Sequence, residues 1–66
     1  MTATINGERR VVAEGATISD LLQVFALPPK SVLVERNGEP VSRASFEHEH
    51  LQEGDHLEVI NMVAGG

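Results

Sequence analysis

The sequence contains no cysteine, and only five of its 66 residues are lysine or arginine. The lack of cysteine excludes disulfide bonds, thiolate metal sites and cysteine nucleophiles. Against ten aspartates and glutamates, the five basic residues leave a formal net charge of −5. This balance argues against nucleic-acid binding, which depends on the neutralisation of phosphates by basic residues, and favours a partner with a basic docking surface.

Long hydrophobic runs are also lacking. No apolar segment approaches the roughly 20 residues that a membrane-spanning helix needs. Residues 1–4 lack the basic region that opens a signal peptide, and no apolar stretch follows them. We therefore expect no membrane association and a cytoplasmic location. The length predicts a single domain, residues 1–66, which is too small for a conventional enclosed active site.

Two Asn-Gly pairs predict two hairpins. Asn6-Gly7 follows the alternating residues 2–5, and Asn37-Gly38 follows the apolar run 32–34. Both central positions of a type I′ turn need a positive φ angle, which asparagine and glycine tolerate. Pro40, in the returning arm of the second hairpin, predicts a short strand at a sheet edge.

Residues 17–26 form the only predicted helix. Thr17 is a suitable N-cap, and Asp20 in the first turn completes only part of a capping box, because glutamate is the usual partner. An apolar stripe at i, i+3, i+4 and i+7 is expected to face the core; it consists of Ile18, Leu21, Leu22 and Phe25. Pro28-Pro29 is expected to end the helix, since neither ring can donate the next hydrogen bond.

Residues 42–54 are polar and irregular, with Phe46 and Leu51 as apolar anchors. The alternation of residues 56–60 then predicts a last strand, with Leu57 and Val59 on one face.

The predicted order is strand, strand, helix, strand, strand, irregular segment, strand. One helix over one mixed sheet is an α+β roll, and its crossover through the helix is expected to be right-handed. The last strand can then lie between the first and third, parallel to the first. This order resembles the β-grasp, or ubiquitin-like, fold: a mixed sheet of four to five strands packed on one helix. Residues 61–66 are expected to form a flexible C-terminal tail.

The histidines do not predict a metal site. His48-Glu49-His50 lies in the irregular segment, and His56 follows across a turn, whereas divalent sites need three or four rigidly held ligands. No serine stands in a Gly-x-Ser-x-Gly elbow, and no glycine-rich phosphate loop is present. We therefore expect no metal, no bound cofactor and no catalytic residue.

The last two residues of the sequence, Gly65-Gly66, are the strongest chemical signal. With the predicted element order, they resemble the ending of ubiquitin-like proteins whose terminal carboxylate is activated by an ATP-dependent enzyme. Two residues without a Cβ can thread a narrow channel and adopt conformations that other residues avoid. On this interpretation the reacting group is the main-chain carboxylate of Gly66.

The whole sequence resembles the ThiS family, the sulfur carriers of thiamin thiazole synthesis. Ala64 stands where many members of that family carry a third glycine. The segments that carry the resemblance extend from the first turn to the last residue: Asn6-Gly7, Asp20-Leu21-Leu22, Val34–Val41, Ser42-Arg43, Leu51–Val59 and Val63–Gly66.

This resemblance implies a carrier, or cosubstrate, and not an enzyme. A ThiF-like adenylyltransferase would activate Gly66 with ATP and magnesium. A sulfur donor system, such as one that starts from a cysteine desulfurase, would convert the adenylate to a thiocarboxylate. The sulfur would then pass to a ThiG-like thiazole synthase.

Two regions are predicted to contact these partners. The tail residues Met62, Val63, Ala64 and Gly65 would enter partner channels, although Met62 alternatively just ends the last strand. Leu33 and Ile60 are predicted to point away from the core and to form a small exposed apolar patch rimmed by acids, or else to be scattered surface residues.

Three other functions are compatible with the sequence. The small subunit of molybdopterin synthase is a sulfur carrier of the same fold, although its chains are usually longer. A ubiquitin-like protein modifier is less compatible, because the tail has no basic residue and Lys30 is the single lysine. An interaction-only domain with fortuitous glycines is the fourth possibility. We expect the free protein to be monomeric.

Overall fold

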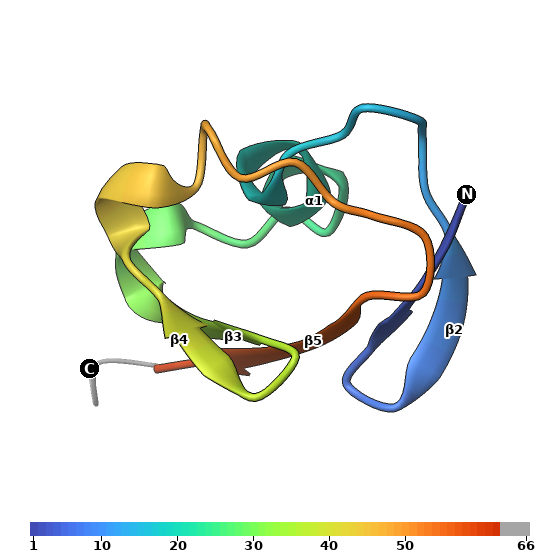
Figure 1. The fold of residues 1–66 in the computed structure, drawn as a ribbon. Helices are drawn as coiled ribbons and strands as arrows, with labels where there is room; N and C mark the ends of the chain where they lie inside the picture. Colours follow the sequence, from blue (N-terminus) through green and yellow to red (C-terminus); the bar gives the residue numbers. More distant parts are fainter. Residues whose placement is uncertain (63–66) are drawn as a thin grey trace.

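The computed structural model describes residues 1–62, which form a five-stranded mixed sheet with one α-helix packed on one face (Figure 1). Across the sheet the strands lie in the order β2-β1-β5-β3-β4. The elements are β1 (Thr2–Ile5), β2 (Glu8–Val11), α1 (Ile18–Val24), β3 (Val32–Arg36), β4 (Glu39–Val41) and β5 (His56–Asn61), with short 3₁₀ turns at Pro29–Ser31 and Arg43–Ser45.

The strand β5 occupies the centre of this sheet. It pairs parallel to β1, with Thr4 beside His56, and antiparallel to β3, with Val34 beside Val59. The predicted β-grasp arrangement, with the last strand between the first and third, is therefore confirmed. The start of β5 is thus paired on both sides, and its end, which leads toward Gly66, is paired with β3.

Both predicted hairpin turns are confirmed, and their asparagines do more than turn the chain. Asn6 and Asn37 each have φ 51°, and the glycines after them also have positive φ. The Asn6 side chain donates to the Val59 carbonyl (3.1 Å) and accepts from the Val59 N–H (2.7 Å). The Asn37 side chain accepts from the His56 N–H (2.9 Å). The two turns therefore hold β5 from opposite edges.

The helix begins as predicted, but with a complete capping box. The Thr17 hydroxyl accepts from the Asp20 N–H (3.1 Å), and the Asp20 carboxylate accepts from the Thr17 N–H (3.0 Å). The expectation of a partial box was wrong, because the shorter aspartate side chain reaches the N-cap backbone here. Both otherwise unpaired backbone donors are satisfied.

The helix ends earlier than predicted, at Val24, and the prolines do not end it. Ala26 has φ 56°, and its N–H donates to the Gln23 carbonyl (3.0 Å), while the Leu27 N–H donates to the Leu22 carbonyl (2.9 Å). This is a Schellman motif, which satisfies the last carbonyls before Pro28 is reached. Alanine takes the left-handed position that glycine usually holds.

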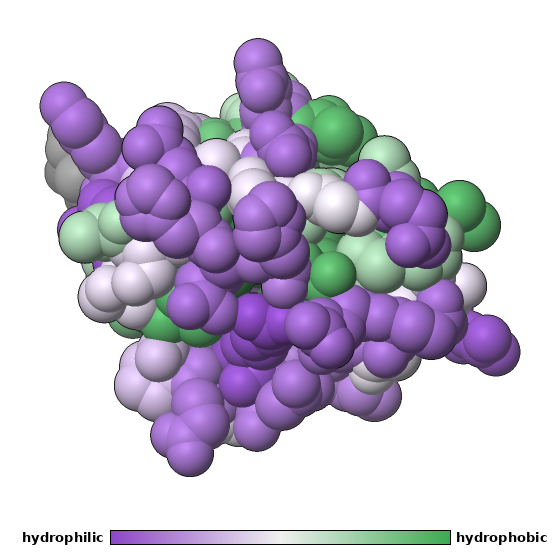
Figure 2. Space-filling view, turned by 45° about the horizontal axis from the view of Figure 1, so that its top comes forward, coloured by the Kyte–Doolittle hydropathy of each residue, from purple (hydrophilic) through white to green (hydrophobic). Residues whose placement is uncertain are grey.

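The core lies between α1 and the sheet, and it contains three of the four residues of the predicted stripe. Phe25 is only partly buried, and its ring lies 5.3 Å from the guanidinium carbon of Arg10. On the face that carries α1, hydrophilic side chains predominate and hydrophobic ones show only in separate areas (Figure 2). The buried core cluster consists of Ile5, Ile18, Leu21, Leu22, Val32, Val34, Phe46, Leu51, Leu57 and Val59.

The irregular segment is held by Asp55, which is 6% exposed. Its carboxylate accepts from the Gln52 N–H (2.8 Å), the Asn37 amide (3.1 Å) and the Arg36 Nε (3.0 Å). Burial raises the pKa of Asp55, but the Gln52 N–H, the Asn37 amide and the Arg36 charge together lower the pKa below its ordinary value. Asp55 is thus an ionised residue that ties this segment to the second hairpin.

Candidate functional site

The end of β5 stays in the sheet longer than predicted. Asn61 pairs with Val32 as the last residue of β5, and the Met62 N–H donates to the Ser31 carbonyl (2.7 Å). The predicted tail boundary at residue 61 was therefore wrong, because backbone pairing with β3 continues through Met62. The predicted tail residues Val63, Ala64, Gly65 and Gly66 lie outside the described residues.

An exposed apolar patch lies beside this strand end. Leu33 and Ile60 are directly opposite each other on β3 and β5, and their exposed fractions are 49% and 50%. Because side chains alternate along a strand, both project from the face of the sheet opposite α1. Met62, 44% exposed, follows Ile60 by two residues and continues the same face. We call Leu33, Ile60 and Met62 the outer apolar patch.

Acidic side chains border the outer apolar patch. Glu35 and Glu58, both exposed, stand opposite each other one alternation step from Leu33 and Ile60. Within residues 1–62, neither glutamate takes part in an ion pair. Like charges directly opposite across two strands are unfavourable, so this pair costs stability in the free protein. The predicted acidic rim is therefore present, and it would attract a basic surface.

A hollow of about 250 Å³ adjoins the outer apolar patch between β3 and β4. Leu33 and Ile60 line it together with Pro40, Val41 and Phe46. Pro40 lies in the edge strand β4, as predicted. The patch thus combines half-exposed apolar side chains with an adjoining depression, and exposed apolar patches often mark contact sites for other proteins.

The histidines lie apart from this region. The His50 Nδ1 lies 2.8 Å from the Gly15 carbonyl oxygen, and His48 and His56 are exposed. Within residues 1–62, no three histidine, aspartate or glutamate side chains form a group able to hold a metal ion. In the same range, no helix is long and apolar enough to cross a membrane.

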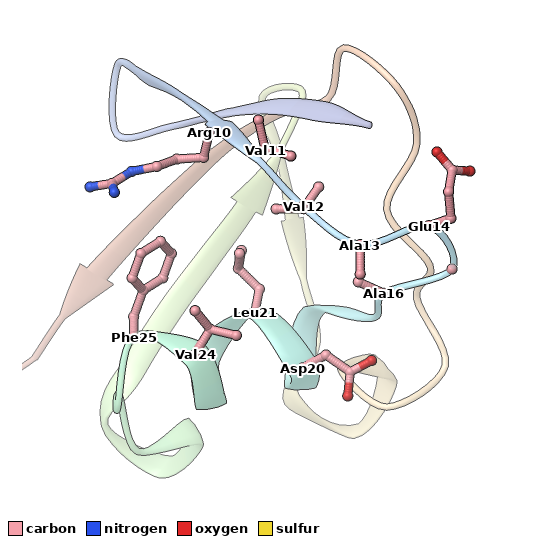
Figure 3. A pocket seen from close by; sticks show the side chains of 11 residues that line it. Arg10, Val11, Val12, Ala13, Glu14, Ala16, Asp20, Leu21, Val24 and Phe25 are labelled. Atoms are coloured by element: carbon pink, nitrogen blue, oxygen red, sulfur yellow. The ribbon is translucent and has the colours of Figure 1, made fainter.

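A second hollow was not predicted from the sequence. It lies between β2 and α1, has a volume of about 370 Å³, and is lined by apolar side chains that include Val12, Leu21, Val24 and Phe25 (Figure 3). We call it the β2 groove. One residue could have indicated this hollow from the sequence: Val24 is apolar although it stands at a solvent-facing position of the helix.

With the geometry of the two surfaces established, comparison with known proteins decides the family. A family model described as the ThiS family matches residues 2–66. The chain belongs to the ThiS family. This ThiS-family chain is 38% identical over 50 residues to the sulfur carrier protein ThiS of Bacillus subtilis, and the match covers 76% of each chain. The resemblance found in the sequence is confirmed.

Solved structures agree with this result. The crystal structure of the thiamine biosynthesis protein ThiS from Geobacter metallireducens matches with a TM-score of 0.84 and 32% identity, over the full length of both chains. An NMR solution structure of a thiamine biosynthesis protein from the same organism matches with a TM-score of 0.82.

Two further relatives are much longer than this ThiS-family chain. Thiazole synthases of Magnetococcus marinus and Paramagnetospirillum magneticum are 38% and 35% identical to it over all 66 residues. The chain spans 20% of the length of each. In both proteins, a ThiS-like region therefore belongs to a polypeptide named thiazole synthase.

Proposed function

We propose that this chain is a sulfur carrier of thiamin biosynthesis, in which the Gly66 carboxylate is adenylated and then converted to a thiocarboxylate. The observation that carries the proposal is the ThiS family match, which extends over residues 2–66 and so includes Gly65-Gly66. The identity to the sulfur carrier protein ThiS of Bacillus subtilis supports it. On this proposal the chain is a cosubstrate and not an enzyme.

Two steps convert the carboxylate. A carboxylate oxygen attacks the α-phosphorus of ATP, and pyrophosphate leaves with the electron pair of the broken P–O bond. Hydrosulfide from the sulfur donor then attacks the acyl carbon, AMP leaves, and one proton is released to solvent. ATP and magnesium belong to a ThiF-like adenylyltransferase. A cysteine desulfurase is a suitable start for the donor system: it forms a persulfide, which thiols reduce to hydrosulfide while they are oxidised to a disulfide. The glycines leave the acyl carbon open to attack from either side.

A ThiG-like thiazole synthase is the proposed recipient of the sulfur. The two thiazole synthases that contain a ThiS-like region support this choice. A carrier and its recipient within one polypeptide meet at a high effective concentration. Where the carrier and the recipient are separate polypeptides, a docking surface has to bring the two together.

We assign docking to Leu33 and Ile60 of the outer apolar patch, and entry into the partner channel to Met62, Val63, Ala64 and Gly65. Ile60 lies on β5 two residues before Met62, and Leu33 lies opposite Ile60 on β3, so a partner that covers both side chains is next to the start of this segment. The exposed Glu35 and Glu58 beside the patch favour a partner surface that carries arginine or lysine.

Intact-mass measurement tests the carrier chemistry. The protein is incubated with ATP, magnesium, a ThiF-like enzyme and sulfide. We expect the mass to rise by the difference between sulfur and oxygen, and a variant without Gly66 to show no rise. The proposal would be refuted if the mass of this protein did not change although the same enzyme preparation modified a known carrier. Adducts on other proteins that survive denaturation would instead indicate a modifier.

Adenylation kinetics test the docking surface. Ile60→Asp removes a half-exposed apolar side chain and places a charge in the contact, so we expect kcat/KM for adenylation to fall by about tenfold or more. Gln23→Glu adds the same charge on the helix and serves as the matched control. Equal kinetics for Ile60→Asp and the control would exclude the outer apolar patch from docking.

A further inference from the structure

The β2 groove is separated from the outer apolar patch by its place in the sheet. The strand β2 is one edge of the sheet, with β1 between it and β5, and the groove opens on the side of the sheet that faces α1 (Figures 1 and 3). Val24, which lines the groove from α1, is 78% exposed. An apolar hollow at a free sheet edge is a place where another chain can add.

The backbone of β2 offers hydrogen bonds along this edge. The Val12 N–H donates to the Met1 carbonyl (2.8 Å), so Val12 directs its backbone groups toward β1. Because these directions alternate along a strand, Arg10 does the same, whereas Arg9 and Val11 direct their N–H and C=O groups away from β1. Within residues 1–62, no strand lies beyond β2.

Charge divides the β2 groove into two ends. Arg10 lies at one end, where it stacks over Phe25 and also contacts Glu8 (2.8 Å), and Arg9 precedes it on the strand. Glu14 and Asp20 lie at the other end, as Figure 3 shows. Apolar side chains line the groove between the two ends. This is a polarised groove, which distinguishes the two directions of an occupant.

We propose that the β2 groove binds an extended segment of a partner protein, added to the sheet as a strand antiparallel to β2. Antiparallel pairing is the more stable arrangement. The segment then runs from Glu14 toward Arg10, so it carries a basic residue at its N-terminal end and an acidic residue at its C-terminal end. Alternate apolar side chains between them enter the groove.

A second copy of the chain fits this edge less well. Two β2 strands paired antiparallel about a two-fold axis would bring Arg9 and Arg10 of both copies together. Like charges opposite each other are destabilising, and each copy also carries a net charge of −5. Charge complementarity therefore selects a foreign segment. Because this segment binds away from β3 and β5, the proposal is independent of the sulfur-carrier function.

A peptide titration followed by NMR tests the proposal on the full chain. The probe is the capped peptide Lys-Thr-Val-Thr-Val-Thr-Glu, and its matched control exchanges the terminal lysine and glutamate. We expect saturable shifts at the amides of Arg9, Val11, Val24 and Phe25, and about tenfold weaker binding of the control peptide. No saturable shifts, equal binding of both peptides, or shifts confined to Leu33 and Ile60 would each overturn the proposal.

Three variants distinguish backbone pairing from nonspecific hydrophobic binding. Val11→Pro removes the outward N–H without loss of a bond to β1, and proline is tolerated at such edge positions. We expect it to weaken peptide binding about tenfold, whereas Val11→Thr keeps the donor and binds within about twofold. Val24→Asp alters a groove side chain that is 78% exposed, so it should fold normally and weaken peptide binding about tenfold. It tests the groove independently if Val11→Pro fails to fold. Dimerisation through β2 without peptide, detected by sedimentation, would identify a second copy as the occupant instead.

Discussion

Asp55→Asn is the substitution whose effect the structure specifies most closely. Every group around the Asp55 carboxylate is a donor: the Gln52 N–H, the Arg36 guanidinium and the Asn37 amide. The asparagine must therefore turn its own NH₂ toward a donor in either orientation. The less disruptive orientation places this NH₂ against the Asn37 amide. In this orientation the hydrogen bond to Asn37 is lost, and so is the carboxylate charge that pairs with Arg36.

The expected loss of stability depends on how many of the interactions around Arg36 remain in Asp55→Asn. Removing one partner of a fully buried ion pair costs about 3–5 kcal/mol. Arg36 is partly exposed and keeps Glu49 (2.7 Å) and the His50 carbonyl (2.7 Å), so we expect the lower figure of about 2–3 kcal/mol. A domain of this length has a free energy of unfolding of roughly 3–10 kcal/mol. The melting temperature should fall by about 10–20 °C.

Urea unfolding as a function of pH provides the assay, with Glu47→Gln, an exposed neighbour on the irregular segment, as the control. Because the folded-state pKa of Asp55 is lowered, its ionised form stabilises the fold fully above the unfolded-state pKa of about 3.9. This contribution is lost as the pH falls through the folded-state value. The difference between wild type and Asp55→Asn should therefore shrink below about pH 4. A loss under about 1 kcal/mol at neutral pH, or a loss unchanged between about pH 7 and pH 2, would refute the reasoning.

Three further substitutions test local features by the same unfolding measurement. Ala26→Gly should raise the free energy of unfolding by about 0.5–1 kcal/mol, because glycine relieves the positive φ angle; destabilisation would contradict the Schellman assignment. Thr17→Ala should cost about 1 kcal/mol through loss of the N-cap, whereas Ser19→Ala should change little. Asn6→Ala should cost about 2 kcal/mol, because it removes two hydrogen bonds to Val59 as well as the residue preferred in the turn. A loss no larger than the turn preference explains would contradict a contribution from the hydrogen bonds to β5.

The parts of the candidate site that the sequence predicts are those that follow from the alternation of side chains along a strand. The pattern of residues 32–34 and 56–60 predicted that Leu33 and Ile60 face away from the core, and both are half-exposed. Their position directly opposite each other depends on the register of β3 and β5. That register results from the packing of both strands against α1, so no local pattern contains it. Their role in docking stays a prediction.

The β2 groove and the Asp55 network depend on segments that are distant in the sequence. Val24 is an apolar residue at a solvent-facing helix position, but only the packing of α1 beside β2 places it with Val12 on one hollow. From the sequence, Asp55 is expected to be a turn residue after Gly54, yet its carboxylate is buried against Arg36. Sequence patterning predicts burial for apolar residues and exposure for charged ones, so it cannot predict a buried, paired carboxylate.

By itself, the sequence determined the features that depend on a few neighbouring residues. The Asn-Gly turns, the Thr17 N-cap and the strand alternation belong to this group, because backbone preferences and side-chain periodicity act over a few residues. The family was found from the likeness of whole segments between Asn6 and Gly66 to the ThiS family. The tertiary structure alone decided where α1 ends, how β5 is held and which side chains share a surface. Alanine at position 26 holds a left-handed conformation because the Schellman hydrogen bonds and the packing of Leu27 against the core outweigh its strain. Such a balance exists only once distant segments have come together.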